Sequence, residues 1–458
     1  MKVKPERFAL AVCVTVILVN LLAAQVPLGT AVAPGTKASN PITHIVIIMQ
    51  ENHAFDNMFG AFPGLAPAYS VLGPNVICNP ISLSNPNNCI SPWNADSESA
   101  TVQASDMGHS WSSSHLAYDS GKMNAFVSSQ AKRHSTIESY PMAYYTGVTL
   151  PNYWDLASYF SLNANFFSSE LSYSYPNHLY LVAASSGGCQ QCKPSNDLTF
   201  PQIVTEMTQY GVSWNYFAGN WKDSNDCKPI SSGGVGYLNV LPDFPAVQLN
   251  SANCKNIKNL NDLYADINAG SLPDVSWVTP LMSNSDHPGH GVQLPTGQEY
   301  ISGIIDGIES QPSLWSSTAI FVSWDDYGGY YDHVLPATAD AYGYGFRVPL
   351  IVISPYAVQG KIFYGPSNGV EEDFSAFLST IEAQWNLSPL TQRDATDASL
   401  LYMLNFNQTP LPPLFLPTNQ LGVYPLSSCP TRLCNTTGTL QHFVLQPLNL
   451  SAAQDAID

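Results

Sequence analysis

Short runs of apolar residues recur along the chain, and they constrain its fold more than any other feature. Five runs of five or six residues, apolar almost throughout, lie at residues 45–49, 179–183, 275–279, 318–323 and 349–354. Strands that are apolar on both faces are typical of parallel sheets covered by helices on both sides. Helical patterns alternate with these runs, at residues 152–159, 201–210, 300–310 and 371–385. The sequence therefore predicts an α/β fold with a mostly parallel central sheet and helices on both faces.

The charge of the chain excludes some classes of partner. Its 458 residues include 16 Lys and Arg against 34 Asp and Glu, for a formal net charge of -18. Nucleic acids and anionic membrane surfaces bind basic patches, so we expect neither as a partner. The hydrophobic share of 45% is enough to bury a large core, which predicts a globular protein.

The N-terminus has the pattern of an export signal. Basic residues among the first seven precede an apolar stretch at residues 8–24. We expect residues 1–33 to be a signal peptide, cleaved after Ala24 or near Ala33, and an uncleaved membrane anchor is the alternative. The protein is then secreted or otherwise extracytoplasmic, without stable membrane insertion after cleavage, and anchoring at the cell surface is the alternative location.

Cysteine usage agrees with export. Eight of the nine cysteines follow the apolar stretch, and an even number in an exported chain indicates disulfides. We expect local pairs, Cys78 with Cys89, Cys189 with Cys192, Cys227 with Cys254, and Cys429 with Cys434. Polar tracts at residues 62–97 and 218–260 hold several of these cysteines, and we expect them to be disulfide-clipped loop excursions of one domain.

Polar side chains follow two of the expected strands directly. Glu51 and Asn52 come after the first run, and Asp325 and Asp326 come after the fourth. The carboxyl ends of parallel strands meet at one edge of a sheet, so these groups would lie together. Carboxylate and amide oxygens suit a divalent cation, and the carboxylates would repel one another without it. Taken singly, each pair fits a helix cap or an Asx turn equally well, but both at one edge favour a metal site.

A serine and three histidines extend the candidate site. Ser174 lies just before Pro176, and a serine near a divalent ion can be ionised and attack phosphorus. His109, His287 and His290 lie in loop-like sequence. Single loop serines and histidines are more often structural, but in an acidic chain these histidines are natural donors to phosphate oxygens and to a leaving group.

Seven segments, in one order, resemble a known family. They are HIVIIMQENHAFDNMFG from His44, DMGHSWSSSHLAYDSGKMNAFV from Asp106, LPNYWDLASYFSLNANFF from Leu150, SYSYPNHLYL from Ser172, LPDVSWVTP from Leu272, SSTAIFVSWDDYGGYYDHVLP from Ser316 and GFRVPLIVISPYA from Gly345. The set resembles the phosphoesterase family that unites bacterial phospholipases C with a branch of acid phosphatases. The resemblance implies an alkaline phosphatase-like fold, with a catalytic domain at residues 41–400 and a Pro-rich C-terminal extension at residues 401–458 packed on it.

The resemblance also implies roles for the candidate residues. The implied metal ligands are Glu51, Asn52, Ser174, Asp325 and Asp326. Ser174 is implied as the nucleophile and His109 and His287 as catalytic histidines, and these two histidines bind substrate together with Asn52 and His290. The implied cofactor is a divalent cation, for which Ca, Mg, Mn and Fe all suit the oxygen-rich set. The implied substrate is a small phosphate ester or a phospholipid head group.

Four positions depart from the usual residues of this family. His53 and His178 stand where Arg is usual, which predicts altered contacts to the phosphate or its substituent. Ser174 replaces the threonine typical of the phospholipase branch, and Asp326 replaces a glutamate. The last two differences favour an acid phosphomonoesterase over a phospholipase C.

The alternative from another class is a non-enzymatic cell-surface or carbohydrate-binding glycoprotein. Four N-glycosylation sequons support it, at Asn386, Asn407, Asn435 and Asn449. This alternative does not explain why acids, an amide, a serine and histidines gather after the expected strands. We therefore expect a secreted hydrolase that acts on phosphoric ester bonds.

Overall fold

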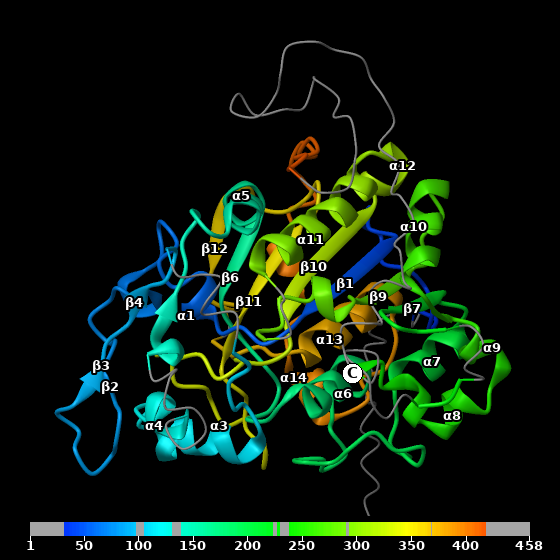
Figure 1. Ribbon diagram of the computed structural model, residues 1–458. Helices are drawn as coiled ribbons and strands as arrows, with labels where there is room; N and C mark the ends of the chain where they lie inside the picture. Colours follow the sequence, from blue (N-terminus) through cyan, green and yellow to red (C-terminus); the bar gives the residue numbers. More distant parts are fainter. Residues whose placement is uncertain are drawn as a thin grey trace, which may run out of the picture. The chain divides into compact units, whose positions relative to one another are not determined.

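An eight-stranded sheet lies at the centre of the unit that begins at Pro34 (Figure 1). The computed structural model describes residues 32–97, 105–130, 139–222, 227–229, 238–289, 293–367 and 369–417. The strand order is β12-β6-β11-β10-β1-β9-β7-β8. The bounds are β1 His44–Gln50, β6 Ser161–Phe167, β7 Trp214–Ala218, β8 Ile257–Lys258, β9 Val275–Thr279, β10 Thr318–Trp324, β11 Arg347–Ile353 and β12 Lys361–Phe363.

The sheet is mostly parallel, as predicted. Strand β1 pairs in parallel with β10 and β9, and the parallel pairing continues through β7 to β8. Strand β11 runs antiparallel to both of its neighbours, β10 and β6. The run at residues 349–354 therefore lies in a strand that runs opposite to the direction predicted for it. The sequence could not show this direction, because a strand buried on both faces has the same apolar pattern whichever way it runs.

The run at residues 179–183 is helical, so its prediction as a strand was wrong. It forms the last turns of α6 (Ser174–Ala183), in which all ten residues are buried. A short apolar run fits a buried helix as well as a buried strand. Pro176 decides between them, because it lies in the first turn, where a helix needs no N–H donor. The helix ends at Ala184, whose left-handed φ of 48° stops it.

Helices cover both faces of the sheet (Figure 1). Phe321 of β10 packs on Phe377 of α13, whereas Trp324 on the opposite face of β10 packs on Tyr153 of α5. One layer contains α5 (Pro151–Tyr159), α10 (Leu260–Ala269), α11 (Leu294–Glu309) and α12 (Pro312–Trp315). The other contains α6, α7 (Ile203–Tyr210), α13 (Ser375–Trp385) and α14 (Gln392–Thr396). The four helices predicted from sequence correspond to α5, α7, α11 and α13.

Shorter elements complete the described chain. The helices are α1 (Phe55–Met58), α3 (Trp111–Tyr118), α4 (Phe126–Gln130), α8 (Pro245–Gln248) and α9 (Ser251–Cys254). Two small strand pairs join β2 (Asn79–Pro80) to β3 (Cys89–Ile90) and β4 (Trp93–Asn94) to β5 (Ala143–Tyr144).

Two of the predicted disulfides are formed. Cys78 bonds to Cys89 across the β2–β3 pair, and Cys189 bonds to Cys192. Cys227 and Cys254 remain thiols in the structure, contrary to the prediction, although the two side chains interact. The pair Cys429 and Cys434 lies outside the described residues. The tract at residues 218–260 is also more regular than a loop excursion, since α8, α9 and the edge strand β8 lie within it.

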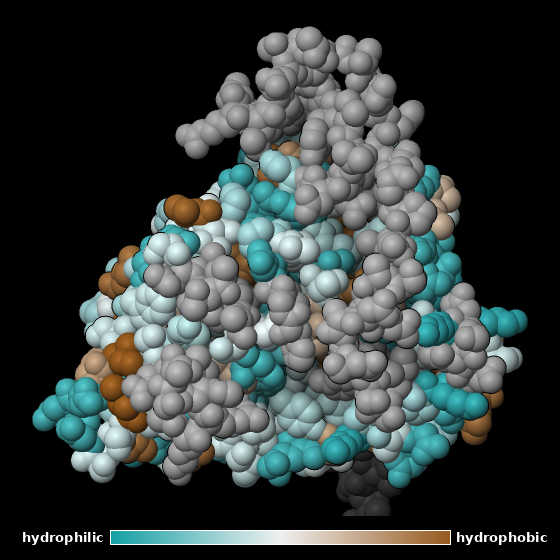
Figure 2. Space-filling view, viewed as in Figure 1, coloured by the Kyte–Doolittle hydropathy of each residue, from teal (hydrophilic) through white to brown (hydrophobic). Residues whose placement is uncertain are grey.

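The described part of the face drawn in Figure 2 is mainly hydrophilic. Figure 2 shows the apolar residues of one face as separate small areas within a hydrophilic surround. Among the described residues, no helix combines the length and the apolar composition that crossing a bilayer requires. The predicted signal peptide lies almost wholly outside the described residues.

Described residues after position 400 contact elements that precede them in the chain. Leu404 forms an isolated bridge with Ala357, beyond the end of β11. Farther on, the backbone N–H groups of Leu414 and Leu416 donate to the carboxyl groups of Glu309 and Asp306 on α11. Residues 418–458 lie outside the described chain.

Candidate active site and metal centre

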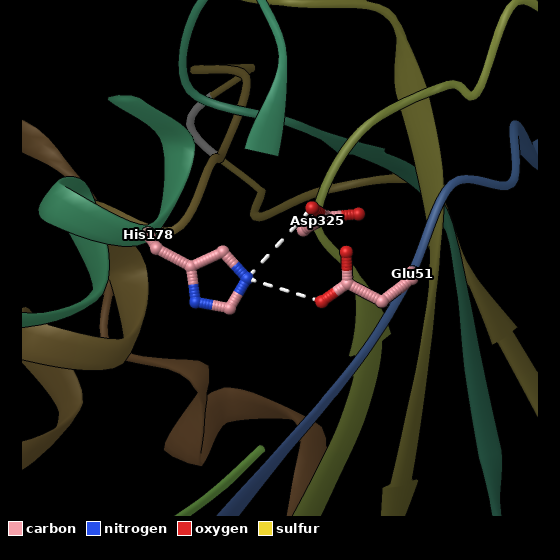
Figure 3. Close-up of side chains that lie close together, drawn as sticks. All are labelled: Glu51, His178 and Asp325. Carbon is pink, nitrogen blue, oxygen red and sulfur yellow. Dashed lines mark ion pairs between the residues drawn. The ribbon is translucent and has the colours of Figure 1, made fainter. Parts of the chain in front are cut away.

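The tips of β1 and β10 bring the predicted acidic residues together. These strands pair in parallel up to Gln50 and Trp324, so the residues that follow, Glu51 and Asp325, lie side by side at the carboxyl edge of the sheet. The backbone N–H of Asn52 donates to Asp325 Oδ1 at 2.8 Å. Figure 3 shows the carboxyl groups of Glu51 and Asp325 pointing into the same space. The structure thus gathers at one place two pairs of residues that lie far apart in sequence.

A glycine allows the two strand tips to approach each other. Gly328 has a φ of +60°, and a Cβ there would lie 2.0 Å from the backbone oxygen of Asn52. Its N–H donates to Asp326 Oδ1 at 2.7 Å, which fixes that carboxyl group. Asn52 itself has a left-handed φ of 63°, a conformation that Asn tolerates better than most residues. A side chain at position 328 would therefore separate the tips that form the site.

Ser174 reaches the same edge from a different strand. Strand β6 also runs parallel to β10, and the loop after it leads to α6, whose first residue is Ser174. The Ser174 hydroxyl donates a long hydrogen bond of 3.4 Å to Asp326 Oδ2. The hydroxyl also lies at the N-terminus of a ten-residue helix, where the backbone dipoles favour negative charge. The structure therefore places the predicted nucleophile beside the predicted metal ligands.

His178 joins this group, a role that the sequence prediction missed. It lies one turn after Ser174 on α6, and its Nε2 lies 3.6 Å from Glu51 Oε1 and 3.7 Å from Asp325 Oδ2 (Figure 3). All three side chains are fully buried. The spacing of four residues puts Ser174 and His178 on one helix face, but this signal could be used only if the segment was known to be helical.

The acids of this site are buried close together, which disfavours their ionisation unless a counter-ion is present. Burial, followed by the charges of Asp325 and Asp326, raises the pKa of Glu51 well above its usual range. Burial and the charge of Asp325 likewise raise the pKa of Asp326. Burial lowers the pKa of His178 to about 4, so its ring is neutral and its lone pair is free to bind.

Several buried polar atoms at this place fit a cation. Among the described residues, no group has hydrogen-bonding geometry to either carboxylate oxygen of Glu51, to the side-chain amide of Asn52 or to Asp325 Oδ2. Buried polar atoms are normally paired, so a cluster of unpaired oxygens needs an explanation. A divalent cation supplies it, since carboxylate and amide oxygens are its usual ligands.

Two of the predicted histidines line the same site. The rings of His109 and His287 meet edge to face, with centroids 6.4 Å apart. Burial lowers the pKa of His109, but the charges of Asp326 and Asp106 outweigh it, so the pKa is raised overall. Burial lowers the pKa of His287. The pKa values of the two rings are therefore shifted in opposite directions. His290 lies outside the described residues.

The His53 ring is enclosed by its neighbours, and altered phosphate contacts at this position remain a prediction. The ring is fully buried and stacks on Tyr330, with centroids 5.1 Å apart. Its Nδ1 lies 2.6 Å from Asn57 Oδ1. A ring enclosed in this way supports the backbone around the site.

A second cluster of acids and a histidine is structural. Asp56, Asp332 and His333 converge next to Arg347, which lies 2.7 Å from Asp56 and 3.1 Å from Asp332. His333 Nδ1 lies 2.6 Å from the other oxygen of Asp56. The guanidinium group therefore provides the positive charge that a cation would otherwise bring.

The sequence of the chain matches one family over most of its length. The match to the model of the phosphoesterase family covers residues 42–388. The chain belongs to the phosphoesterase family. It is therefore a hydrolase that acts on phosphate ester bonds, which favours the enzyme over the non-enzymatic glycoprotein.

The curated relatives are phospholipases C. "Phospholipase C A" of Mycobacterium tuberculosis is 28% identical over 69% of this chain and 68% of its own length. "Non-specific phospholipase C1" of Arabidopsis thaliana is 26% identical over 78% and 70%. "Non-hemolytic phospholipase C" of Burkholderia pseudomallei is 26% identical over 75% of this chain and 55% of its own length.

Solved structures show a weaker likeness. A protein of the alkaline phosphatase superfamily from Vibrio parahaemolyticus is 12% identical, with a TM-score of 0.38 over 79% of this chain and 72% of that one. The lipoteichoic acid synthase LtaP of Listeria monocytogenes is 8% identical, with a TM-score of 0.37 over 80% and 75%. At this level of similarity, nothing about function follows from either structure.

Proposed function

We propose that this chain is a metal-dependent phosphoesterase whose nucleophile is the hydroxyl of Ser174. The observation that carries the proposal is the meeting of Ser174 with Glu51, Asp325 and Asp326 at one buried sheet edge, where several oxygen atoms lack partners. A nucleophilic hydroxyl and a cation-binding set side by side suit the hydrolysis of a phosphate ester in two steps.

The proposed metal ligands are Glu51, Asn52, Ser174, Asp325 and Asp326. A bound divalent cation would supply positive charge that stabilises the ionised serine and the phosphoryl oxygens. Ser174 lies at the positive end of α6, which also favours its ionised form. Its attack on phosphorus would expel the alcohol and leave a phosphoserine, which water then hydrolyses.

In this proposal His109 and His287 have different catalytic roles. His109 has a raised pKa and faces the charge of Asp326, so it is suited to donate a proton to the leaving alcohol. His287 has a lowered pKa, which favours its neutral form, so it is suited to hold a phosphoryl oxygen or the incoming water. His109 Nδ1 lies 2.7 Å from the Met107 carbonyl oxygen, which leaves Nε2 for the substrate.

Two substrate classes remain within this proposal. The serine nucleophile and the Asp325 and Asp326 pair favour phosphomonoesters, because Ser174 and Asp326 depart from the residues typical of the phospholipase branch. The phospholipase C relatives favour phospholipids. A side-by-side assay decides between them, with p-nitrophenyl phosphate, p-nitrophenylphosphorylcholine and phosphatidylcholine vesicles as substrates, each with and without a chelator.

The nucleophile has its own test. We expect Ser174→Ala to lose at least a thousandfold in kcat on every substrate that the protein hydrolyses, while its circular dichroism and melting temperature stay unchanged. Ser172→Ala is the matched control, because that hydroxyl is also buried but donates to the Gln190 carbonyl oxygen. Turnover by Ser174→Ala at the rate of the control would show that another group attacks phosphorus.

We also propose that the protein is exported and glycosylated. The apolar stretch at residues 8–24 and the disulfides Cys78–Cys89 and Cys189–Cys192 support export. The sequon residues Asn386 and Asn407 are exposed, as acceptors must be. Intact-mass analysis of protein from the culture medium, before and after glycosidase treatment, tests both points.

A further inference from the structure

We propose that His178 is a nitrogen ligand of the metal, and that the resident ion is a transition metal of the Mn, Fe, Co or Zn class rather than Ca or Mg. The inference rests on the proposed function, which supplies the metal site. It adds a ligand of a different chemical type, and with it a choice of ion, to the oxygen ligands of Glu51, Asn52 and Asp325.

The distances around His178 fit shared coordination better than hydrogen bonding. Its Nε2 lies 3.6 Å from Glu51 Oε1 and 3.7 Å from Asp325 Oδ2. N–H···O hydrogen bonds span roughly 2.7–3.2 Å, so both contacts are too long. Ligands held at about 2.1 Å from one ion are separated by roughly 3.0–3.5 Å, so a small inward movement of the side chains would complete the shell.

The ring is held in this direction by the helix that carries it. His178 lies on the face of α6 that also presents Ser174 to the site. On the sheet side, the Trp277 indole N–H of β9 donates to the Leu181 carbonyl oxygen at 3.2 Å, which ties α6 to the sheet. The imidazole is fully buried, and its Nε2 points at two carboxylate oxygens without hydrogen-bond partners, Glu51 Oε1 and Asp325 Oδ2 (Figure 3). It therefore needs no large rearrangement to bind an ion placed between them.

The type of ligand selects the type of ion. Ca²⁺ and Mg²⁺ prefer shells made wholly of oxygen atoms. Imidazole nitrogen is a ligand of first-row transition metals, which also accept carboxylates. A site with His178, Glu51 and Asp325 is thus a mixed nitrogen and oxygen site, and we expect it to retain a transition metal in the presence of excess Ca²⁺ and Mg²⁺.

The test measures metal binding directly on the purified full-length protein. After removal of its metal with a chelator, the wild type is dialysed against equal concentrations of Ca²⁺, Mg²⁺, Mn²⁺ and Zn²⁺, and the bound ions are counted by mass spectrometry. We expect about one equivalent of Mn²⁺ or Zn²⁺. The Mn²⁺-loaded protein should also show nitrogen coupling from a histidine by pulsed electron paramagnetic resonance.

His178→Gln should abolish the nitrogen coupling and lower the affinity for Mn²⁺ at least tenfold, while His115→Gln, on the surface helix α3, should change neither. Wild-type Mn²⁺ protein without nitrogen coupling would overturn the inference, and this measurement does not depend on the folding of any variant. Glu51→Gln separates the two proposals. If it loses Mn²⁺ but the wild type shows no nitrogen coupling, only the role of His178 is wrong; if it binds Mn²⁺ as the wild type does, the proposed metal site itself is wrong.

Discussion

His53 Nε2 lies 3.0 Å from the backbone carbonyl oxygen of Asp286, the residue directly before His287. Asp286 has a left-handed φ of 65°, so the turn that presents His287 is strained. Hydrogen bonds also fix the Asp286 side chain, since its Oδ2 accepts from Gln50, Tyr153 and Trp324. His53 and these donors therefore support the turn that carries His287.

The first prediction follows from this support. His53→Ala removes the group that faces the Asp286 carbonyl oxygen, so the turn can relax and His287 can move. We expect kcat to fall about tenfold, which corresponds to roughly 1.4 kcal/mol, with little change in KM or metal content. Steady-state kinetics with metal analysis is the measurement. Tyr330→Phe is the control, because it keeps the ring that stacks on His53. Wild-type kcat in His53→Ala would show that the contact with Asp286 does not position His287, and an equal loss in Tyr330→Phe would show that the effect is not specific to His53.

Asn177 carries the second prediction, because its side chain fills the loop that leads to Ser174. Its Oδ1 accepts from the N–H groups of Ser169 and Glu170, and its amide donates to the carbonyl oxygens of Glu170, Ser172 and Tyr173. Asn177→Ala leaves two buried N–H groups unpaired, at about 1–3 kcal/mol each.

We expect Asn177→Ala to lower both the free energy of unfolding and kcat, and urea denaturation with kinetics on the same preparation measures the two. Asn165→Ala serves as a comparison, since Asn165 lies on the neighbouring strand β6 and away from the loop. Normal kcat in a destabilised Asn177→Ala would limit the role of this side chain to stability.

The sequence was enough to predict the acidic residues of the site, because their positions depend only on residues next to them in the chain. Glu51 and Asp325 each follow an apolar run directly, so recognising the strands was enough to place them at one edge. His178 could not be placed in the same way. Its position depends on whether residues 174–183 form a helix or a strand, and an apolar run is compatible with both.

The direction of β11 and the role of His53 were hidden for a different reason. Both depend on contacts between segments far apart in the chain: β11 pairs with β10 and β6, and His53 contacts Asp286. The strand β6 was missed because Ser161, Asn163 and Asn165 interrupt its apolar residues. Asn163 is nevertheless buried, because its amide donates to Glu372.

The third prediction concerns Arg347, which joins the segments that follow β1 and β10. Its guanidinium group binds Asp56 and Asp332, donates to the Ala164 carbonyl oxygen and lies 4.2 Å from the Phe55 ring centroid. Arg347→Met leaves two buried carboxylates without their counter-charge. We expect a loss of about 3–5 kcal/mol in the free energy of unfolding, measured in urea.

Arg347→Lys is the sharper variant, because it keeps the charge but cannot bind both carboxylates as the planar guanidinium does. We expect it to be destabilised almost as strongly as the methionine variant. Wild-type stability of the lysine variant would show that charge alone matters here.

The fourth prediction concerns pH and the strap, defined as residues 404–417, which is the last described segment of the chain. Burial raises the pKa of Asp306 well above its usual range, and burial together with the charge of Asp306 does the same for Glu309. Both carboxyl groups accept backbone N–H groups of the strap, from Leu416 and Leu414. Burial, followed by the charge of Glu309, raises the pKa of Tyr159.

The raised pKa values determine whether the free energy of unfolding rises or falls with pH. In the unfolded chain these acids ionise near pH 4, whereas in the folded protein they stay protonated to a higher pH. The folded state therefore binds more protons, and the free energy of unfolding falls as the pH rises from about 4 through the folded pKa values. Asp306→Asn with Glu309→Gln keeps an acceptor oxygen for each N–H but removes the ionisation. We expect the double variant to lose less stability than the wild type between pH 5 and pH 8, measured as melting temperature across a pH series. Other buried acids contribute to the same trend in both proteins, so the difference between the two melting-temperature curves isolates the effect of Asp306 and Glu309. Parallel curves would show that these two groups do not link pH to folding.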